Sequence, residues 1–229
     1  MKIIYATISK TGKRPQNEDA VLVSEAPEKE RWTGIVCDGL GGHKGGEIAS
    51  NTVITAFMNY WMDQEKQEDS KEKILYACAS AFKELNAKAN ELHHLEMGTT
   101  LVMASIKEEQ FTVVHVGDSR CYLFRENSGL LFQTRDHTED SFGWEVINRC
   151  FFSYDPIKAY PDIMQFPVKS GDRILLCSDG VYKSMTPEAL QALMQEYDTP
   201  EQIIEAMDRI CQTESHDNYS AIVAFCEES

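Results

Sequence analysis

Three apolar runs in this sequence end in an aspartate that is followed by a small residue. They are "GIVCDG" at Asp38, "VVHVGDS" at Asp118 and "ILLCSDG" at Asp179, and a fourth aspartate, Asp217, opens the later run "DNYSAIV". A single Asp-Gly after a strand is an ordinary turn signal. Carboxylates that converged from several strand ends would repel one another unless divalent cations lay between them. Four such aspartates therefore favour a cation site over a series of unrelated turns.

Strands come in runs in this sequence and do not alternate strictly with helices. By alternation or by short apolar runs, we expect strands at 2–9, 20–24, 32–38, 99–106, 111–116, 120–125, 130–134, 162–168, 172–178 and 218–226. Helical spacing predicts helices from Gly46 to about Met62 and from Ile74 to Leu92, and two more over 187–196 and about 200–212. Such an order is typical of an α+β fold, with antiparallel sheets and helices packed outside them.

Length and charge narrow the class of protein. With 229 residues, of which 42% are hydrophobic, we expect a single domain over 1–229. The formal charge of −15 argues against nucleic-acid binding, because backbone phosphates would be repelled. No apolar run is long enough for a membrane span and no signal peptide is recognisable, so we expect a cytoplasmic protein. Nothing in the sequence requires more than a monomer.

The seven cysteines form no Cys-x-x-Cys pair and stand in mostly apolar surroundings. An odd number of such cysteines indicates buried free thiols in a reducing compartment. The pattern implies neither a zinc site nor disulfides.

The loop "RPQNED" places Arg14 shortly before the carboxylates of Glu18 and Asp19. A solvated turn is one reading, since Pro, Asn and Asp are turn formers. The aspartates at the strand ends favour another. An all-oxygen set of ligands suits Mn²⁺ or Mg²⁺, and two such ions can share a water, lower its pKa and aim it at phosphorus. Arg14 would then hold the phosphate through its planar donor fork, and Glu18 and Asp19 would edge the metal cluster.

Seven motifs together carry a resemblance to a known family. In order they are "RPQNED", "VCDGLGGHKGGEIAS", "GTTLVMASI", "VVHVGDSRCYLF", "TRDHT", "ILLCSDGVY" and "DNYSAIV". From about residue 5 to 226 the chain resembles the metal-dependent protein phosphatases, the type 2C serine/threonine phosphatases, in their small bacterial form. The resemblance implies an α-β-β-α sandwich of two antiparallel sheets flanked by helices, with two Mn²⁺ or Mg²⁺ ions at one end. It also implies hydrolysis of phosphoserine and phosphothreonine in phosphoproteins, the products of serine/threonine kinases.

The resemblance assigns the inner metal ligands to particular residues. Asp38 matches the carboxylate that bridges both metals, and the carbonyl of Gly39 would bind one of them. Asp179 and Asp217 match the remaining inner ligands. A water or hydroxide shared by the two ions would attack the phosphorus directly.

Outer positions of the metal site follow from the same motifs. Glu18 and Asp19 would act chiefly through metal-bound water, and Asp118 matches a carboxylate that helps to hold a weaker third metal in bacterial members. Four glycines would let the chain turn beneath the metals and enter the helix: Gly41, Gly42, Gly45 and Gly46. The glycine run is not followed by Gly-Lys-Ser/Thr, so we discount a nucleotide loop.

The chain departs from the family pattern at Leu40, where many animal members have a histidine proposed to protonate the leaving group. A metal-bound water is the substitute that we propose, and His43 is the alternative. The second departure is the segment 139–160, which is short relative to the family's helical flap. Substrate choice is therefore open.

Segment 139–160 is rich in aromatic residues. For Phe142, Trp144 and Ile147 we expect a short helix packed onto the sheet. Phe151 and Phe152 are adjacent in a predicted loop, where both cannot easily face a core. We therefore expect at least one of them to be exposed and to dock the substrate polypeptide.

Other functions have less support in the sequence. No cysteine is followed six positions later by arginine, and no Asp-x-Asp occurs, which excludes two other phosphatase chemistries. His216-Asp217 spells the dipeptide of helical metal phosphohydrolases, but the chain has too many strands for such a fold. The alternative from another class is an inactive phosphatase-like module that binds phosphopeptides or acts as a scaffold.

Overall fold

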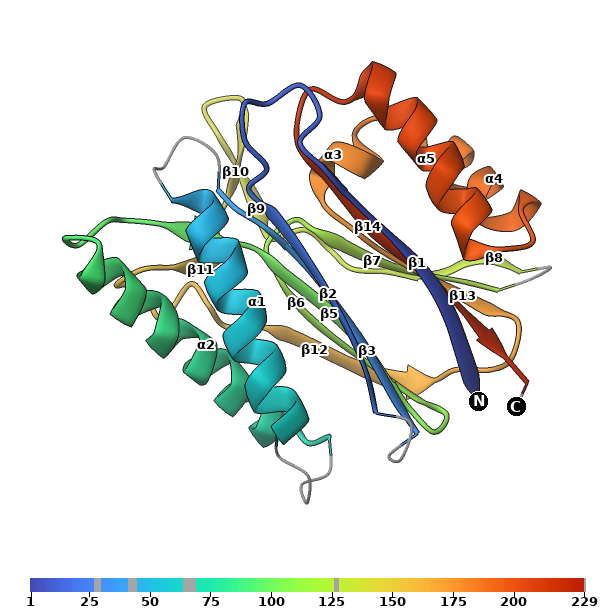
Figure 1. Ribbon diagram of the computed structural model, residues 1–229, viewed down its shortest axis with the longest axis horizontal. Helices are drawn as coiled ribbons and strands as arrows, with labels where there is room; N and C mark the ends of the chain where they lie inside the picture. The colour runs from blue at the N-terminus through green and yellow to red at the C-terminus, as the bar shows by residue number, and fades with distance from the viewer. Residues whose placement is uncertain (27–29, 41–44, 64–68, 126–127, 229) are drawn as a thin grey trace.

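Two antiparallel sheets lie face to face between two layers of helices (Figure 1). The structure is a computed structural model that describes residues 1–26, 30–40, 45–63, 69–125 and 128–228. The α-β-β-α sandwich expected from the sequence is confirmed. All seven cysteines are buried and free, as predicted. Among the described helices, none has the length and apolar character needed to cross a membrane.

The first sheet has the strand order β1-β14-β13-β7-β8. Its strands are β1 (Lys2–Lys10), β7 (Arg120–Arg125), β8 (Gly129–Gln133), β13 (Asp172–Cys177) and β14 (Tyr219–Glu227). β1 and β14 pair along their whole length, from Lys2 opposite Glu227 to Lys10 opposite Tyr219. The segment that follows β1 and the segment that precedes β14 are thereby brought to the same end of the sandwich.

The second sheet has the order β12-β6-β5-β3-β2. Its strands are β2 (Asp19–Ala26), β3 (Arg31–Asp38), β5 (Leu101–Lys107), β6 (Gln110–Val116) and β12 (Asp162–Pro167). The register of β2 and β3 sets Asp19 directly opposite Asp38. Two predicted carboxylates are therefore neighbours at one edge of the sheet because of strand pairing alone.

Helices cover the outer face of each sheet (Figure 1). α1 (Gly46–Asp63) and α2 (Lys71–Glu91) pack on the second sheet, and α4 (Pro187–Glu196) and α5 (Pro200–Glu214) pack on the first. A third buried cluster, which includes Trp32 and Ile222, fills the space between the two sheets. Thr186 and Thr199 cap α4 and α5, since each hydroxyl accepts a backbone N–H from the first turn.

Four short strands were not predicted as separate elements, and two of them correct the expectation for Phe142 and Trp144. Strands β9 (Thr138–Ser141) and β10 (Trp144–Ile147) form a hairpin where we expected a helix. Phe142 and Gly143 have φ of 55° and 83° and make the turn between them. This turn points the rings of Phe142 and Trp144 away from the sheet, and they are 102% and 76% exposed. The prediction that they pack in the core is wrong, and Ile147 alone is partly buried.

The other two elements, β4 (Gly98–Thr99) and β11 (Phe151–Phe152), pair with each other. Adjacent residues of a strand point to opposite faces. Phe151 is therefore fully buried in the cluster beneath α1 and α2, and Phe152 is partly buried. The expectation that one of these rings is exposed is wrong because the segment is a paired strand. Docking of substrate on Phe151 is excluded by its burial, and docking on Phe152 stays a prediction.

Candidate metal centre

The predicted carboxylates gather where the strands end at one side of the sandwich. Asp38 ends β3, Asp118 lies between β6 and β7, Asp179 begins the short helix α3 (Asp179–Tyr182), and Asp217 precedes β14. Burial raises the pKa of the Asp38 carboxyl well above its ordinary value. The charges that raise this pKa further are those of Asp19, Asp179, Asp118 and Asp217. The electrostatics thus identify Asp38 as the residue on which the other carboxylates converge.

Asp19 carries a buried polar atom that lacks a partner. Its side chain is buried, and the Ser178 hydroxyl donates to Oδ2 at 2.7 Å. Oδ1 has no hydrogen-bond partner among the described residues. Burial raises the pKa of Asp19 to about 7, and burial followed by the charge of Asp179 raises that of Asp118 to about 7. Divalent cations would supply the partner and the positive charge that these carboxylates lack.

Backbone hydrogen bonds fix Asp38 independently of its carboxylate. Its N–H donates to the Thr100 hydroxyl at 2.9 Å, and its carbonyl accepts from the Thr99 hydroxyl and from the Thr100 N–H, each at 2.9 Å. The Gly39 N–H donates to the Glu18 carbonyl at 3.1 Å. The carboxylate is therefore held in the centre by the frame of the sheet and by burial.

Asn218 organises the loop that carries Arg14 and Glu18. Its Nδ2 donates to the carbonyls of Thr11 and Gln16, each at 2.8 Å, and its Oδ1 accepts the Glu18 N–H at 2.9 Å. These three bonds tie the "RPQNED" loop to the start of β14. Asn218 stands in the motif "DNYSAIV", but no local pattern indicates its role, because its partners are distant in the chain.

Gly180 lets the chain carrying Asp179 pass directly beside β14. A Cβ at position 180 would lie 1.9 Å from the Asn218 carbonyl oxygen, where no side chain fits. The glycine after the aspartate is thus required by close approach of two backbones.

Two cations border the carboxylates. Arg14 Nη2 pairs with Asp217 Oδ2 at 2.7 Å, and Lys183 Nζ pairs with Asp179 Oδ2 at 2.7 Å. The Arg14 side chain is 49% exposed, so its fork is accessible from solvent. Burial raises the pKa of Glu18 above its ordinary value, and the nearby charge of Arg14 offsets part of this rise. The loop is therefore more than a solvated turn, and Lys183 is a residue that sequence reasoning missed.

The donor set fits the metals predicted from the sequence. It consists of carboxylate oxygens with an unpaired buried Oδ1 on Asp19, which suits Mn²⁺ or Mg²⁺. Leu40 is partly buried, and its N–H donates to the Gly98 carbonyl at 3.0 Å. His43, Gly41 and Gly42 lie outside the described residues. Gly45 and Gly46 lead into α1, where a Cβ on Gly46 would meet the Glu18 carboxyl carbon at 2.9 Å.

Comparisons with known proteins agree with this geometry. The family model described as "Protein phosphatase 2C" matches residues 9–223. Serine/threonine phosphatase Stp of Listeria innocua is 31% identical over 208 residues, which cover 77% of this chain and 76% of the relative. The crystal structure of the Mycobacterium tuberculosis phosphatase PstP superposes with a TM-score of 0.83 at 27% identity, covering 99% of both chains. A structure of the PstP catalytic domain in complex with two manganese ions gives a TM-score of 0.81 at 28% identity, again covering 99% of both chains.

Proposed function

The chain belongs to the protein phosphatase 2C family, and from that membership we propose that it hydrolyses phosphoserine and phosphothreonine in proteins at the centre around Asp38. The enzyme class is protein-serine/threonine phosphatase. The observation that carries the proposal is the convergence of four other carboxylates on the partly buried Asp38. Protein kinases are the class of enzyme that must supply such substrates. The buried free cysteines suit a reducing compartment and support a cytoplasmic location for the reaction.

The metal ligands that we propose are those that the family motifs assign. Asp38 would contact both ions, with the Gly39 carbonyl on one and Asp179 and Asp217 completing the inner set. Glu18 and Asp19 would act through intervening water. Asp118 stands where a weaker third ion would be held.

Two bound Mn²⁺ or Mg²⁺ ions would lower the pKa of a water molecule for attack on phosphorus and neutralise charge that develops on the phosphoryl oxygens. Arg14, at the rim beside Asp217, would orient the phosphate through its guanidinium. Leu40 has no proton to give, so water is the acid that we propose for the leaving serine or threonine oxygen. His43, the alternative acid, lies outside the described residues.

The first test is metal-dependent release of inorganic phosphate from a phosphothreonine peptide. We expect turnover with Mn²⁺, loss of turnover on chelation, and recovery when Mn²⁺ is restored. Asp179→Asn, purified in the same way, controls for a contaminating phosphatase. An inactive phosphopeptide-binding module, the alternative from the sequence, would bind the peptide and release no phosphate under any metal condition.

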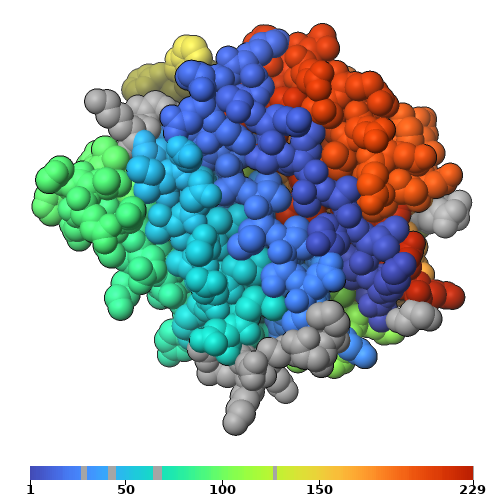
Figure 2. Space-filling model, in the orientation of Figure 1, coloured from blue at the N-terminus to red at the C-terminus, as the bar shows by residue number. Residues whose placement is uncertain are grey.

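The exposed β9–β10 hairpin is the surface that we propose for the polypeptide part of the substrate. Burial lowers the pKa of Lys183, and the pairing with Asp179 and the charge of Asp118 raise it above its ordinary value. The charge of Glu145 on β10 adds a smaller rise, so the hairpin borders the centre. Figures 1 and 2 show the hairpin, in yellow, beside the blue N-terminal loop. Phe142 and Trp144 present apolar rings there, which suits side chains that flank a phosphorylated residue.

Replacing both rings, Phe142→Ser with Trp144→Ser, is expected to lower kcat/KM for a phosphopeptide about tenfold or more and to leave an aryl phosphate unaffected. The reason is that only the peptide is long enough to reach the hairpin. Tyr76→Ser, which removes a 61% exposed ring from α2, is the matched control. Equal losses on both substrates would assign the rings to the structure of the centre instead.

A further inference from the structure

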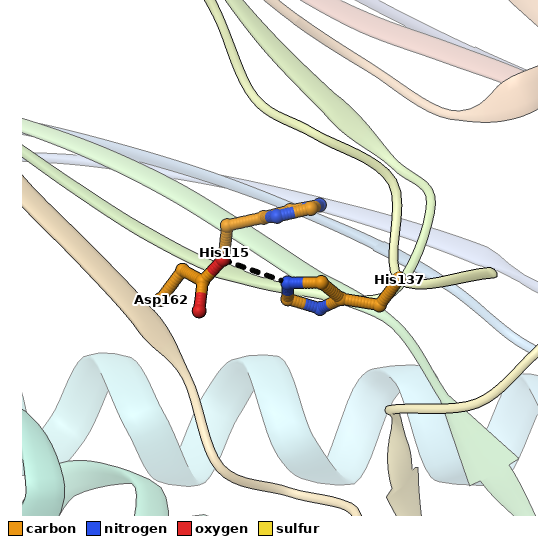
Figure 3. Close-up of side chains that lie close together, drawn as sticks. All are labelled: His115, His137 and Asp162. Carbon is orange, nitrogen blue, oxygen red and sulfur yellow. Dashed lines mark hydrogen bonds and ion pairs between the residues drawn. The ribbon is translucent and has the colours of Figure 1, made fainter.

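His115, His137 and Asp162 form a compact group outside the carboxylate centre (Figure 3). Their potential ligand atoms lie within 4.8 Å of one another, and both histidines are buried. His115 belongs to β6, Asp162 begins β12, and His137 lies between β8 and β9. The group resembles a metal site, but its hydrogen bonds assign it a different role.

His137 forms two hydrogen bonds with Gly117, the residue directly before Asp118. The Gly117 N–H donates to His137 Nδ1 at 3.1 Å, and the His137 backbone N–H donates to the Gly117 carbonyl at 2.9 Å. Gly117 has a φ of 114°, and a Cβ there would lie 2.6 Å from the Thr100 side chain. The backbone that enters Asp118 is thus fixed by two hydrogen bonds to one histidine.

These bonds decide where the ring proton of His137 lies. Burial, and then the charge of Arg149, lower the pKa of His137 to about 4, so the ring is neutral at neutral pH. A neutral imidazole has one nitrogen lone pair, and Nδ1 uses it to accept from Gly117. Nε2 therefore carries the proton and donates to Asp162 Oδ2 at 3.0 Å.

A metal ion in this group would need a free lone pair on His137 Nε2. Because Nδ1 uses its lone pair to accept from Gly117, Nε2 carries the proton and has no lone pair to offer. Arg149 Nη2 also pairs with Asp162 Oδ1 at 2.9 Å, so a cation is already present in the group. The observation in favour of a metal is that neither ring nitrogen of His115 has a hydrogen-bond partner among the described residues. The two observations on His137 and Arg149 outweigh it.

Asp136, the residue before His137, binds Arg120, which stands two positions after Asp118. Its carboxylate accepts both Nε and Nη2 of Arg120, at 2.9 and 2.7 Å. The Arg120 guanidinium in turn lies 3.6 Å from the ring centroid of Tyr182. A bidentate pair of this kind fixes direction as well as distance.

We propose that Asp136 and His137 are positioning residues that clamp Gly117 and Arg120 and thereby aim the Asp118 carboxylate at the metal centre. Asp162 accepts the Nε2 proton of His137 and thereby keeps the ring in the tautomer whose Nδ1 accepts from Gly117. The consequence for catalysis rests on the proposed function, whereas the clamp itself is measured without any substrate.

A pair of amide variants tests the clamp. Asn places its amide near the position of Nδ1, and Gln places its amide near that of Nε2. We therefore expect His137→Asn to keep Mn²⁺ affinity within about threefold of wild type, and His137→Gln to weaken it about tenfold, the low end for partners outside the ligand shell. Titration calorimetry with Mn²⁺ measures both. Since each variant replaces the same ring by one amide, thermal unfolding of the metal-free proteins should shift alike, which separates positioning from general damage.

Nitrogen NMR of the imidazole rings provides the reading that is independent of activity. The expected spectrum shows His137 neutral with the proton on Nε2 and the lone pair on Nδ1, together with slow hydrogen exchange of the Gly117 amide. If wild type released no phosphate, the proposed function would fail and this spectrum would still decide the clamp.

Two results would overturn the proposal. One is an equal loss of Mn²⁺ affinity in His137→Asn and His137→Gln. The other is a proton on Nδ1 combined with stoichiometric Zn²⁺ binding that His115→Ala abolishes, which would make the group a metal site.

Discussion

Asp38→Asn is expected to lower phosphate release by about three decades or more, even at saturating Mn²⁺, because the variant removes the charge on which the other carboxylates converge. The fold should be retained. Asparagine has nearly the same volume, and the Asp38 backbone is held by Thr99 and Thr100 whatever the side chain carries. Removing a charge from a repulsive cluster should leave the thermal midpoint of the metal-free protein unchanged or raise it.

Asp198→Asn is the matched control, since this exposed aspartate precedes α5 and is not one of the proposed metal ligands. Its kcat should equal that of wild type. The measurements are initial rates over a range of Mn²⁺ concentrations and thermal unfolding with and without chelator. Wild-type kcat in metal-saturated Asp38→Asn would contradict the assignment of this residue to both ions.

Arg14→Ala is expected to raise KM for an aryl phosphate and to lower kcat/KM by about one to three decades, the scale of a lost charge-assisted contact to phosphate. The guanidinium is half-exposed at the rim and contacts Asp217 through one nitrogen. Affinity for Mn²⁺ should therefore stay near that of wild type, because the inner carboxylates remain in place.

Two further variants sharpen this test. Lys13→Ala removes an adjacent exposed cation, whose Nζ donates to the Thr213 carbonyl, and should leave KM unchanged. Arg14→Lys keeps the charge without the planar fork and should fall between wild type and Arg14→Ala. A collapse of Mn²⁺ affinity in Arg14→Ala would show that the arginine holds the loop and Asp217 together instead of the phosphate.

The sequence predicted the sheets and the main helices because their apolar patterns are long. Asp38 and Asp179 were singled out for the same reason, since each stands at the end of a largely buried strand and a charge at such a place is costly. Strand β11 has two residues and no period to detect. In the β9–β10 hairpin, aromatic content suggested a core, but the turn at Phe142 and Gly143 turns the rings outward. Composition does not encode which way a turn points.

Residues that support the centre over long sequence distances escaped prediction. Asn218 bonds to the Thr11 carbonyl across 207 positions, and no local pattern reports such a pair. Gly180 reads as half of a common turn until β14 is seen to pass beside it. The motif "TRDHT" was recognised, but the hydrogen bonds of His137 to Gly117 required the coordinates.

Because β1 pairs with β14, the centre combines residues that are synthesised at the beginning and at the end of translation. Arg14 follows the first strand of the fold and Asp217 precedes the last, 203 positions later, yet the two side chains touch. A chain growing on the ribosome therefore carries Arg14, the proposed phosphate-binding residue, from the start and lacks Asp217, a proposed metal ligand, until almost everything else has been made. Contacts so distant in sequence form late in folding, because the loop they close must be ordered first. We expect a nascent or prematurely terminated chain that lacks β14 to have no phosphatase activity. Activity would therefore require that β14 has been translated and has paired with β1.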